Sequence, residues 1–210
     1  EQTLSLLLGL LRGLPVFFRQ AQAKEFVRRP TDDLRGKRVG IVGLGGNGRR
    51  LVQLLAPFGV TLRATDYYPV RKPPEVFELW GAERLQELAS LSDVLILSLP
   101  LNTQTQRLIS EEVLRAMPRG GYLINVARGQ VVDEQALLRA LQDGHLGGAG
   151  LDVTYVEPLP VESPLWELAN VIITPHVGAQ AASRVDDSTQ LAVRNLSRFF
   201  SGEQLLNIVD

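Results

Sequence analysis

The chain has 210 residues, a formal net charge of −1 and no cysteine. The absence of cysteine excludes disulfides, thiolate metal sites and a cysteine nucleophile, and it mildly favours a cytoplasmic location. Charges of both signs are interspersed, so we expect neither nucleic acid nor an anionic membrane as a partner. The apolar content of 45% is enough for the core of a soluble domain.

An apolar segment opens the chain between residues 1 and 22. Arg12 interrupts it, and it is shorter than the roughly 18 residues that a membrane-spanning helix needs. A secretory signal is disfavoured as well, because Glu1 and Gln2 stand where a basic leader is required. A helix that is apolar over most of its circumference is usually buried, so we expect it to pack partly on its own domain and partly on a second subunit. The residues expected at that subunit contact are Leu4, Leu7, Leu8, Leu11 and Leu14.

The stretch 36–66 has the pattern of a strand, a glycine-rich turn, a helix and a second strand. Residues 38–42 form a short apolar run that is typical of a buried parallel strand. Gly43, Gly45 and Gly48 then fill the pattern G-x-G-x-x-G, in which the glycines permit a tight turn, close approach of a pyrophosphate and close packing of helix on strand. A lone pattern of this kind is often only a turn. Here the flanking elements are in register with it, which favours dinucleotide binding.

Asp66 ends the second predicted strand, which begins at residue 60. A carboxylate at this position accepts hydrogen bonds from a ribose 2′-hydroxyl and repels a 2′-phosphate. We therefore predict NAD as the cofactor in preference to NADP.

Strands and helices alternate through the rest of the chain. We predict a surface loop over 67–74, strands over 93–99, 122–126, 146–153 and 171–174, and helices over 83–91, 110–117, 134–142 and 179–200. Ser110 and Asp133 are expected to cap two of these helices. The alternation predicts an α/β fold with a doubly wound parallel sheet.

Loops at the carboxyl ends of the predicted strands carry the residues with chemical potential. Arg128 follows one strand directly and can grip a carboxylate through two parallel hydrogen bonds. Asp152 and Glu157 follow the next strand, and His176, one of two histidines in the chain, follows the last. Singly, these residues have structural explanations as a surface charge, solvated acids and a hydrogen-bonding histidine. Their common place at one sheet edge predicts a site.

Four motifs together resemble the cofactor domain of the D-2-hydroxyacid dehydrogenases over the whole chain. They are GLGGNG at 43–48, NVARG at 125–129, GLDVTYVEP at 150–158 and ITPHVG at 173–178. The resemblance implies a Rossmann-type fold and an enzyme that reduces small 2-keto acids. It also implies that Arg128 binds the substrate, that His176 is the general acid/base and that Glu157 hydrogen-bonds His176.

The resemblance further implies a set of cofactor contacts. Asp152 would bind the nicotinamide carboxamide, and the other expected cofactor residues are Gly43, Gly45, Gly46, Asn47, Gly48, Asp66, Pro100, Thr105, Val126 and Gly178. The family usually has Arg-Ile where this chain has Gly46 and Asn47. Backbone contacts to the pyrophosphate should survive that difference, whereas side-chain packing on the cofactor is expected to change.

General chemistry agrees with these roles. Hydride addition to a keto carbon builds negative charge on its oxygen, so an imidazolium must donate a proton and a guanidinium nearby stabilises the charge. Imidazole titrates near neutral pH, and a neighbouring carboxylate favours its charged form. The nicotinamide would carry out the redox step, and we predict no metal site.

Family members begin with a substrate domain that is lacking here. We therefore interpret the chain as part of a longer enzyme, with residues 1–30 as a helical crossover and dimer contact and 31–210 as the Rossmann core. The resemblance implies a homodimer. Two alternatives stay open: an NAD(H)-sensing module like the corepressors that resemble this fold, and a phosphite dehydrogenase on the same scaffold.

Overall fold

The computed structural model describes residues 1–68, 71–180 and 184–208. It divides into two compact units, one from Glu1 to His176 and the other from Val177 to Asp210. The first unit contains the sheet and all helices except α7 (Arg184–Phe200). We predicted the α7 helix from residue 179, and residues 181–183 lie outside the described part of the chain.

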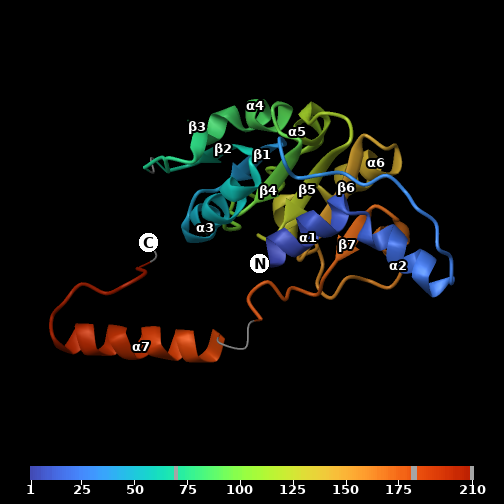
Figure 1. Cartoon of the computed structure of the whole chain (residues 1–210). Coiled ribbons are helices and arrows are strands. Elements are labelled where there is room, and N and C mark those ends of the chain that lie inside the picture. Colours follow the sequence, from blue (N-terminus) through green and yellow to red (C-terminus); the bar gives the residue numbers. More distant parts are fainter. Residues whose placement is uncertain (69–70, 181–183, 209–210) are drawn as a thin grey trace. The chain divides into compact units, whose positions relative to one another are not determined.

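The first unit is built on a parallel sheet whose strands follow the order β3-β2-β1-β4-β5-β6-β7 (Figure 1). The strands are β1 (Arg38–Val42), β2 (Thr61–Asp66), β3 (Val76–Gly81), β4 (Val94–Leu97), β5 (Gly121–Asn125), β6 (Leu146–Leu151) and β7 (Val171–Ile173). Every neighbouring pair is parallel. The predicted doubly wound α/β fold is therefore confirmed.

Helices cover both faces of the sheet, and each face has its own hydrophobic cluster. α1 (Gln2–Leu11) and α3 (Gly46–Leu55) supply leucines to one cluster, while α4 (Leu85–Ser90), α5 (Glu111–Ala116) and α6 (Glu134–Gln142) supply the other. Strand residues alternate between them: Ile41 packs with α1 and α3, and Val42 packs on the opposite face. The predicted caps are confirmed, because Ser110 accepts from the N–H of Val113 and Asp133 from that of Ala136.

Short 3₁₀ turns complete the first unit. They are η1 (Ala56–Phe58), η2 (Ala82–Arg84), η3 (Gly129–Val131) and η4 (Pro164–Glu167). Strand β3 lies at the sheet edge, where the sequence pattern predicted no element. Its side chains are mostly half-buried, so it lacks the continuous apolar run of the central strands.

Helix α1 packs unusually closely on β6 and β7, and glycines make this possible. A Cβ on Gly150 of β6 would lie 2.8 Å from the Cβ of Leu6, and one on Gly9 would lie 2.9 Å from Ile172. The expectation that this helix packs on its own domain is thereby confirmed. The expectation that Leu7 and Leu11 face a second subunit is wrong, because they are buried in the core of this chain.

The N-terminal apolar segment forms two helices rather than one. Gly13 adopts a left-handed φ of 67° between α1 and α2 (Leu14–Gln22), and Pro15 follows in the first turn of α2. The axes of the two helices differ by 71°. None of the described helices is by itself long and apolar enough to cross a membrane, and only this bent pair passes the test of length and composition jointly.

Candidate functional site

The site lies along the edge where the carboxyl ends of the parallel strands meet. In sheet order this edge carries Asp66 at the end of β2, the glycine turn after β1, Pro100 after β4, Arg128 after β5, Asp152 and Glu157 after β6 and His176 after β7. The chain runs from β1 outward to β3 and then returns to β4 on the other side of β1. Ligands of open α/β sheets bind at such a switch point.

The glycine turn after β1 is shaped by contacts that a side chain would prevent. Gly43 has a φ of 93°, and a Cβ there would collide with the backbone oxygen of Ser98. A Cβ on Gly48 would collide with the carbonyl of Gly43, so this glycine lets α3 approach the strand. Gly45 and Gly46 have open space around them. The turn therefore packs tightly on the protein at Gly43 and Gly48 and leaves free space at Gly45 and Gly46.

Asp66 is tied to this turn. Its Oδ2 accepts the N–H of Leu44 at 2.6 Å, and its Oδ1 accepts the N–H of Tyr68 at 3.0 Å. A carboxylate has about four acceptor positions, so these bonds orient Asp66 while it can still accept ribose hydroxyls. Asp66 lines a cavity of about 340 Å³ together with Gly43, Gly45, Pro100 and Thr105.

The residues at the next strand end adjoin a second cavity, of about 490 Å³. Asn47, Pro100, Val126 and Arg128 line it. The side-chain amide of Asn47 donates to the Ser98 hydroxyl at 3.2 Å. This chain departs from the usual family pattern at Gly46 and Asn47. Gly46 leaves the backbone of the turn accessible, and Asn47 contributes a polar side chain to the wall of this cavity.

Arg128 is presented by a tightly fastened loop. Asn125, almost fully buried, accepts the N–H of Ala127 at 3.0 Å and donates to the carbonyl of Arg128 at 3.0 Å. A Cβ on Gly129 would collide with the Thr154 carbonyl, so only glycine lets this loop press against the loop after β6. The Gln130 amide donates across the same contact to the carbonyl of Tyr155 at 2.8 Å.

Glu157 and His176 form a direct pair. The Nδ1 of His176 lies 2.9 Å from Glu157 Oε2, and Glu157 Oε1 accepts the N–H of Thr154 at 3.2 Å. The backbone N–H of His176 donates to the carbonyl of Asp152 at 2.8 Å. Both paired side chains remain about two-fifths exposed. Because Nδ1 faces the carboxylate, Nε2 is the ring nitrogen placed to exchange a proton with a ligand.

Asp152 lies beneath this pair and is only 2% exposed. Its Oδ1 accepts the Thr174 hydroxyl at 2.6 Å and the side-chain amide of Gln2 at 3.2 Å. Asp152, Glu157 and His176 line one cavity of about 580 Å³. The expected residues after β6 and β7 are therefore brought together.

One expected residue cannot be placed with the others. Gly178 belongs to the second compact unit, which begins at Val177. Three residues that were not expected in the site take part in its architecture: Gln2, Ser98 and Thr174, the last of which had been quoted only within a motif. Asn125 had been quoted only as part of a motif. Its burial at a strand end was the one available signal, since buried polar groups require partners.

The residues at this edge fit a dinucleotide. No side chain in the described residues caps α3 at Gly45, so its first N–H groups remain to be satisfied by solvent or by an anion. The open space at Gly45 and Gly46 admits a pyrophosphate, and the Asp66 carboxylate beside it suits a ribose.

Comparison with known proteins identifies the family. A family model described as D-isomer specific 2-hydroxyacid dehydrogenase, NAD binding domain, matches residues 4–178. This chain therefore belongs to the D-isomer specific 2-hydroxyacid dehydrogenase family, and the part of the family that it matches is the NAD-binding domain.

Particular relatives agree with this assignment. A glyoxylate reductase of Thermococcus kodakarensis is 40% identical over 81% of this chain and 51% of its own length. A Xanthobacter autotrophicus D-isomer specific 2-hydroxyacid dehydrogenase, solved with NADPH and MES, is 37% identical with a TM-score of 0.87, covering all of this chain and 87% of that one. An NADPH-dependent glyoxylate/hydroxypyruvate reductase from Sinorhizobium meliloti, solved with NADP and sulfate, is 31% identical with a TM-score of 0.85, covering 97% and 65%. The chain spans about half the length of the first curated relatives that it matches.

Proposed function

We propose that this chain is the cofactor-binding part of an enzyme that transfers a hydride between NAD(H) and a small 2-keto or 2-hydroxy acid. One observation carries the proposal: Gly129 fastens the loop of Arg128 against the loop of Glu157, whose carboxylate holds His176 at 2.9 Å. This contact positions two side chains beside the cavities that suit a dinucleotide. Arg128 is a cation that can bind a carboxylate, and His176 is a proton donor. The names of the relatives support the substrate class.

The proposed chemistry assigns one task to each side chain. A bound NADH would supply the hydride. Arg128 binds the substrate carboxylate and stabilises the charge that develops on the carbonyl oxygen. Glu157 accepts a hydrogen bond from Nδ1 and thereby orients the ring, so that Nε2 of His176 donates a proton to that oxygen. In the direction of alcohol oxidation, His176 takes the proton back.

We further infer that NAD(H) is preferred to NADP(H). The argument rests on Asp66, whose carboxylate is fixed beside the glycine turn by the N–H groups of Leu44 and Tyr68. A 2′-phosphate would place negative charge against it. Three solved relatives contain NADPH or NADP, which supports a nicotinamide cofactor in general. We therefore base the preference for NAD(H) over NADP(H) on Asp66 of this chain.

The substrate class is tested by turnover. NADH oxidation is measured with glyoxylate, hydroxypyruvate, pyruvate, bulkier keto acids and, in the oxidising direction with NAD, phosphite. We expect keto acid reduction by an enzyme in which this domain is joined to a substrate domain, and almost none by the 210-residue chain alone. Closure over the substrate positions the reacting groups and excludes water, effects worth several powers of ten in rate. Phosphite oxidation without keto acid reduction would contradict the proposal.

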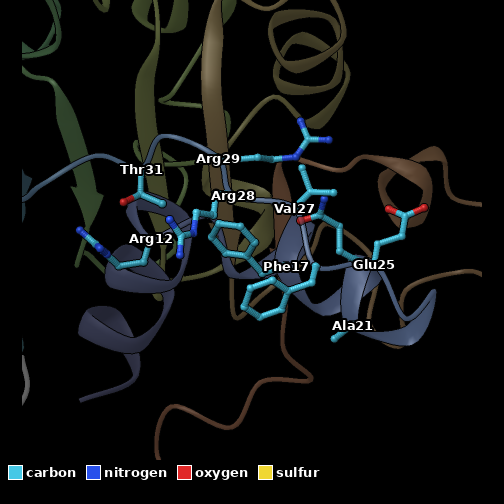
Figure 2. A pocket seen from close by; sticks show the side chains of 10 residues that line it. Arg12, Phe17, Ala21, Glu25, Val27, Arg28, Arg29 and Thr31 are labelled. Atoms are coloured by element: carbon cyan, nitrogen blue, oxygen red, sulfur yellow. The ribbon is translucent and has the colours of Figure 1, made fainter.

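We also propose that the assembly is a homodimer in the cytoplasm, with the contact on α2 and the connector after it. Leu14, Phe18 and Phe26 are 40%, 63% and 95% exposed. Phe26 lines a cavity of about 580 Å³ shown in Figure 2, where Arg12 and Thr31 lie on one side of Phe17 and Glu25 on the other. Leu14 and Phe18 line a separate cavity of about 390 Å³. Grouped apolar exposure of this kind commonly marks an interface.

The exposed aromatic side chains of this segment provide a test of the contact. Sedimentation at micromolar concentration should show a dimer that Phe18→Glu with Phe26→Glu dissociates. A monomeric parent would refute the dimer.

A further inference from the structure

Gln2 belongs to none of the motifs that define the site, yet its side chain reaches into it. It lies in the first turn of α1 and is half-buried. Its amide nitrogen donates to the Thr174 hydroxyl at 2.7 Å and to Asp152 Oδ1 at 3.2 Å. The N-terminal helix therefore contacts two residues at the carboxyl ends of β6 and β7, which lie 150 and 172 positions later in the chain.

The direction of these hydrogen bonds is fixed by chemistry. The Thr174 hydroxyl donates its hydrogen to Asp152 Oδ1 at 2.6 Å, so its oxygen faces Gln2 as an acceptor. The Asp152 oxygen is an acceptor as well. A side chain at position 2 must therefore bring hydrogen to both atoms, which an amide nitrogen does and a carboxylate cannot.

The position of Gln2 is rigidly determined by the packing of α1. Gly150 lets this helix approach β6 at a distance that a Cβ would prevent, because that Cβ would lie 2.8 Å from the Cβ of Leu6, and Gly9 faces the side-chain end of Ile172 on β7. Leu6 and Leu7 of the same helix are buried. The same strand ends continue into the loop of His176, whose backbone N–H donates to the Asp152 carbonyl at 2.8 Å. Gln2 thus donates a hydrogen bond to the buried carboxylate of Asp152, which lines the same cavity as Glu157 and His176.

We propose that Gln2 is a positioning residue that orients the Asp152 carboxylate for the nicotinamide carboxamide. This inference rests on the proposed function, in which Asp152 recognises that end of the cofactor. With Oδ1 held by Gln2 and Thr174, the plane of the carboxylate is set before the cofactor binds. Preorganisation of this kind raises affinity, because less ordering remains to be done on binding.

The test compares two ligands that differ at the nicotinamide end. NADH carries the nicotinamide, whereas ADP-ribose shares only the remainder of the dinucleotide. For Gln2→Leu in the 210-residue chain, calorimetry should show NADH binding weakened about three- to tenfold and ADP-ribose binding unchanged. Ser5→Ala, on the exposed side of the same helix, should change neither value. Retained ADP-ribose binding also establishes that each variant is folded.

A second variant gives a signature that a purely structural role would not produce. The carboxyl introduced by Gln2→Glu would lie against Asp152, so it must keep its proton in order to donate. Below its titration point the carboxyl donates its single hydrogen to one of the two acceptors, so the preference for NADH over ADP-ribose should lie between that of Gln2→Leu and that of the parent. Above that point the two carboxylates repel, and the preference should fall as the pH rises, while the parent ratio stays constant over the same range.

The two hypotheses fail in different ways. A parent chain that binds neither NADH nor ADP-ribose would overturn the proposed function and this inference with it. A parent that binds both, with Gln2→Leu changing the two affinities equally or not at all, would overturn only the role of Gln2. A pH-independent ratio for Gln2→Glu would do the same.

Discussion

Charged groups at the amino-terminal ends of the strands (the amino edge of the sheet) have different partners from those at the carboxyl-terminal ends (the carboxyl edge). At the amino edge, Arg38 and Asp93 bind each other: guanidinium nitrogens lie 2.5 and 3.1 Å from the carboxylate oxygens, and the N–H of Arg38 donates to Asp93 at 2.8 Å. The bonds from Arg38 hold the pKa of the Asp93 carboxyl below its ordinary value, against the opposing effect of burial. These charges join the first residue of β1 to the start of β4.

At the carboxyl edge the charged groups instead face outward from fastened loops. Arg128 is exposed, and Glu157 and His176 keep about two-fifths of their side-chain surface. Their loops are also held by the buried Asn125, the close contact of Gly129 and the backbone bonds of His176. At the amino edge the two charged groups bind each other, whereas at the carboxyl edge Arg128, Glu157 and His176 stay partly exposed. This difference fits the proposed role of the second set in binding a ligand.

The largest effect is expected from removal of His176, the proposed proton donor. In the enzyme that includes the substrate domain, His176→Asn should lower keto acid turnover by about 10²- to 10⁴-fold and leave NADH affinity nearly unchanged. His145 is the matched control, since it is buried with Nε2 3.1 Å from the Leu114 carbonyl. His145→Asn should lower the melting temperature without comparable loss of turnover. Equal loss of turnover in both variants would contradict the assignment.

The glycine turn offers a second test, with a control three residues away. Gly43→Ala combines a left-handed φ of 93° with a collision against Ser98, so NADH affinity should fall at least about tenfold. Gly46→Ala meets open space in a helical turn and should be tolerated. Calorimetric titration with NADH compares them. Similar affinities for both variants would show that the turn does not shape the cofactor site.

Removing the carboxylate of Glu157 should lower turnover by a smaller factor. Glu157 Oε2 lies 2.9 Å from Nδ1 of His176, so it orients the ring with Nε2 toward a ligand. Glu157→Gln replaces this acceptor with an amide, so kcat for keto acid reduction should fall about tenfold while NADH affinity stays nearly unchanged. Steady-state kinetics measure this, and an unchanged kcat would refute the pairing.

The smallest effect is expected from breaking the ion pair between Arg38 and Asp93 at the amino edge. Asp93→Asn should lower the free energy of unfolding by about 1 kcal/mol at neutral pH and leave NADH binding unaffected. Because the pKa of Asp93 is lowered in the fold, its stabilisation exists above the unfolded-state value near 4 and is lost as the pH falls through the folded-state value. Urea unfolding should therefore show parent and variant converging in acid. A constant difference would contradict the ion pair's role.

Local patterns were enough to predict much of the fold. Residues 38–42 and 134–142 have the predicted bounds, and Ser110 and Asp133 cap as expected, because apolar periodicity and capping side chains act over a few residues. Strand β3 was missed because an edge strand lacks the apolar run of a buried one. The break between α1 and α2 follows from Gly13, whose left-handed conformation has no periodic signal.

The sequence predicted candidate site residues more readily than the contacts that hold them. The loops at strand ends predicted Arg128, Glu157 and His176, and the structure brings Glu157 and His176 into contact. Gln2 and Gly129 could not be found in that way, because each acts through a contact between distant segments. Their roles appear only when the fold brings α1 against β6 and the loop after β5 against the loop after β6.

The central claim is that the carboxyl edge of this sheet binds NAD(H), with Asp66 selecting against the 2′-phosphate. The most direct measurement is a fluorescence titration of the 210-residue chain with NADH and with NADPH, repeated for Asp66→Ala. We predict that the parent binds NADH at least about tenfold more tightly than NADPH, and that the variant binds NADH more weakly with a narrower difference between the two. Equal affinity of the parent for both cofactors, or no binding of either, would contradict the account.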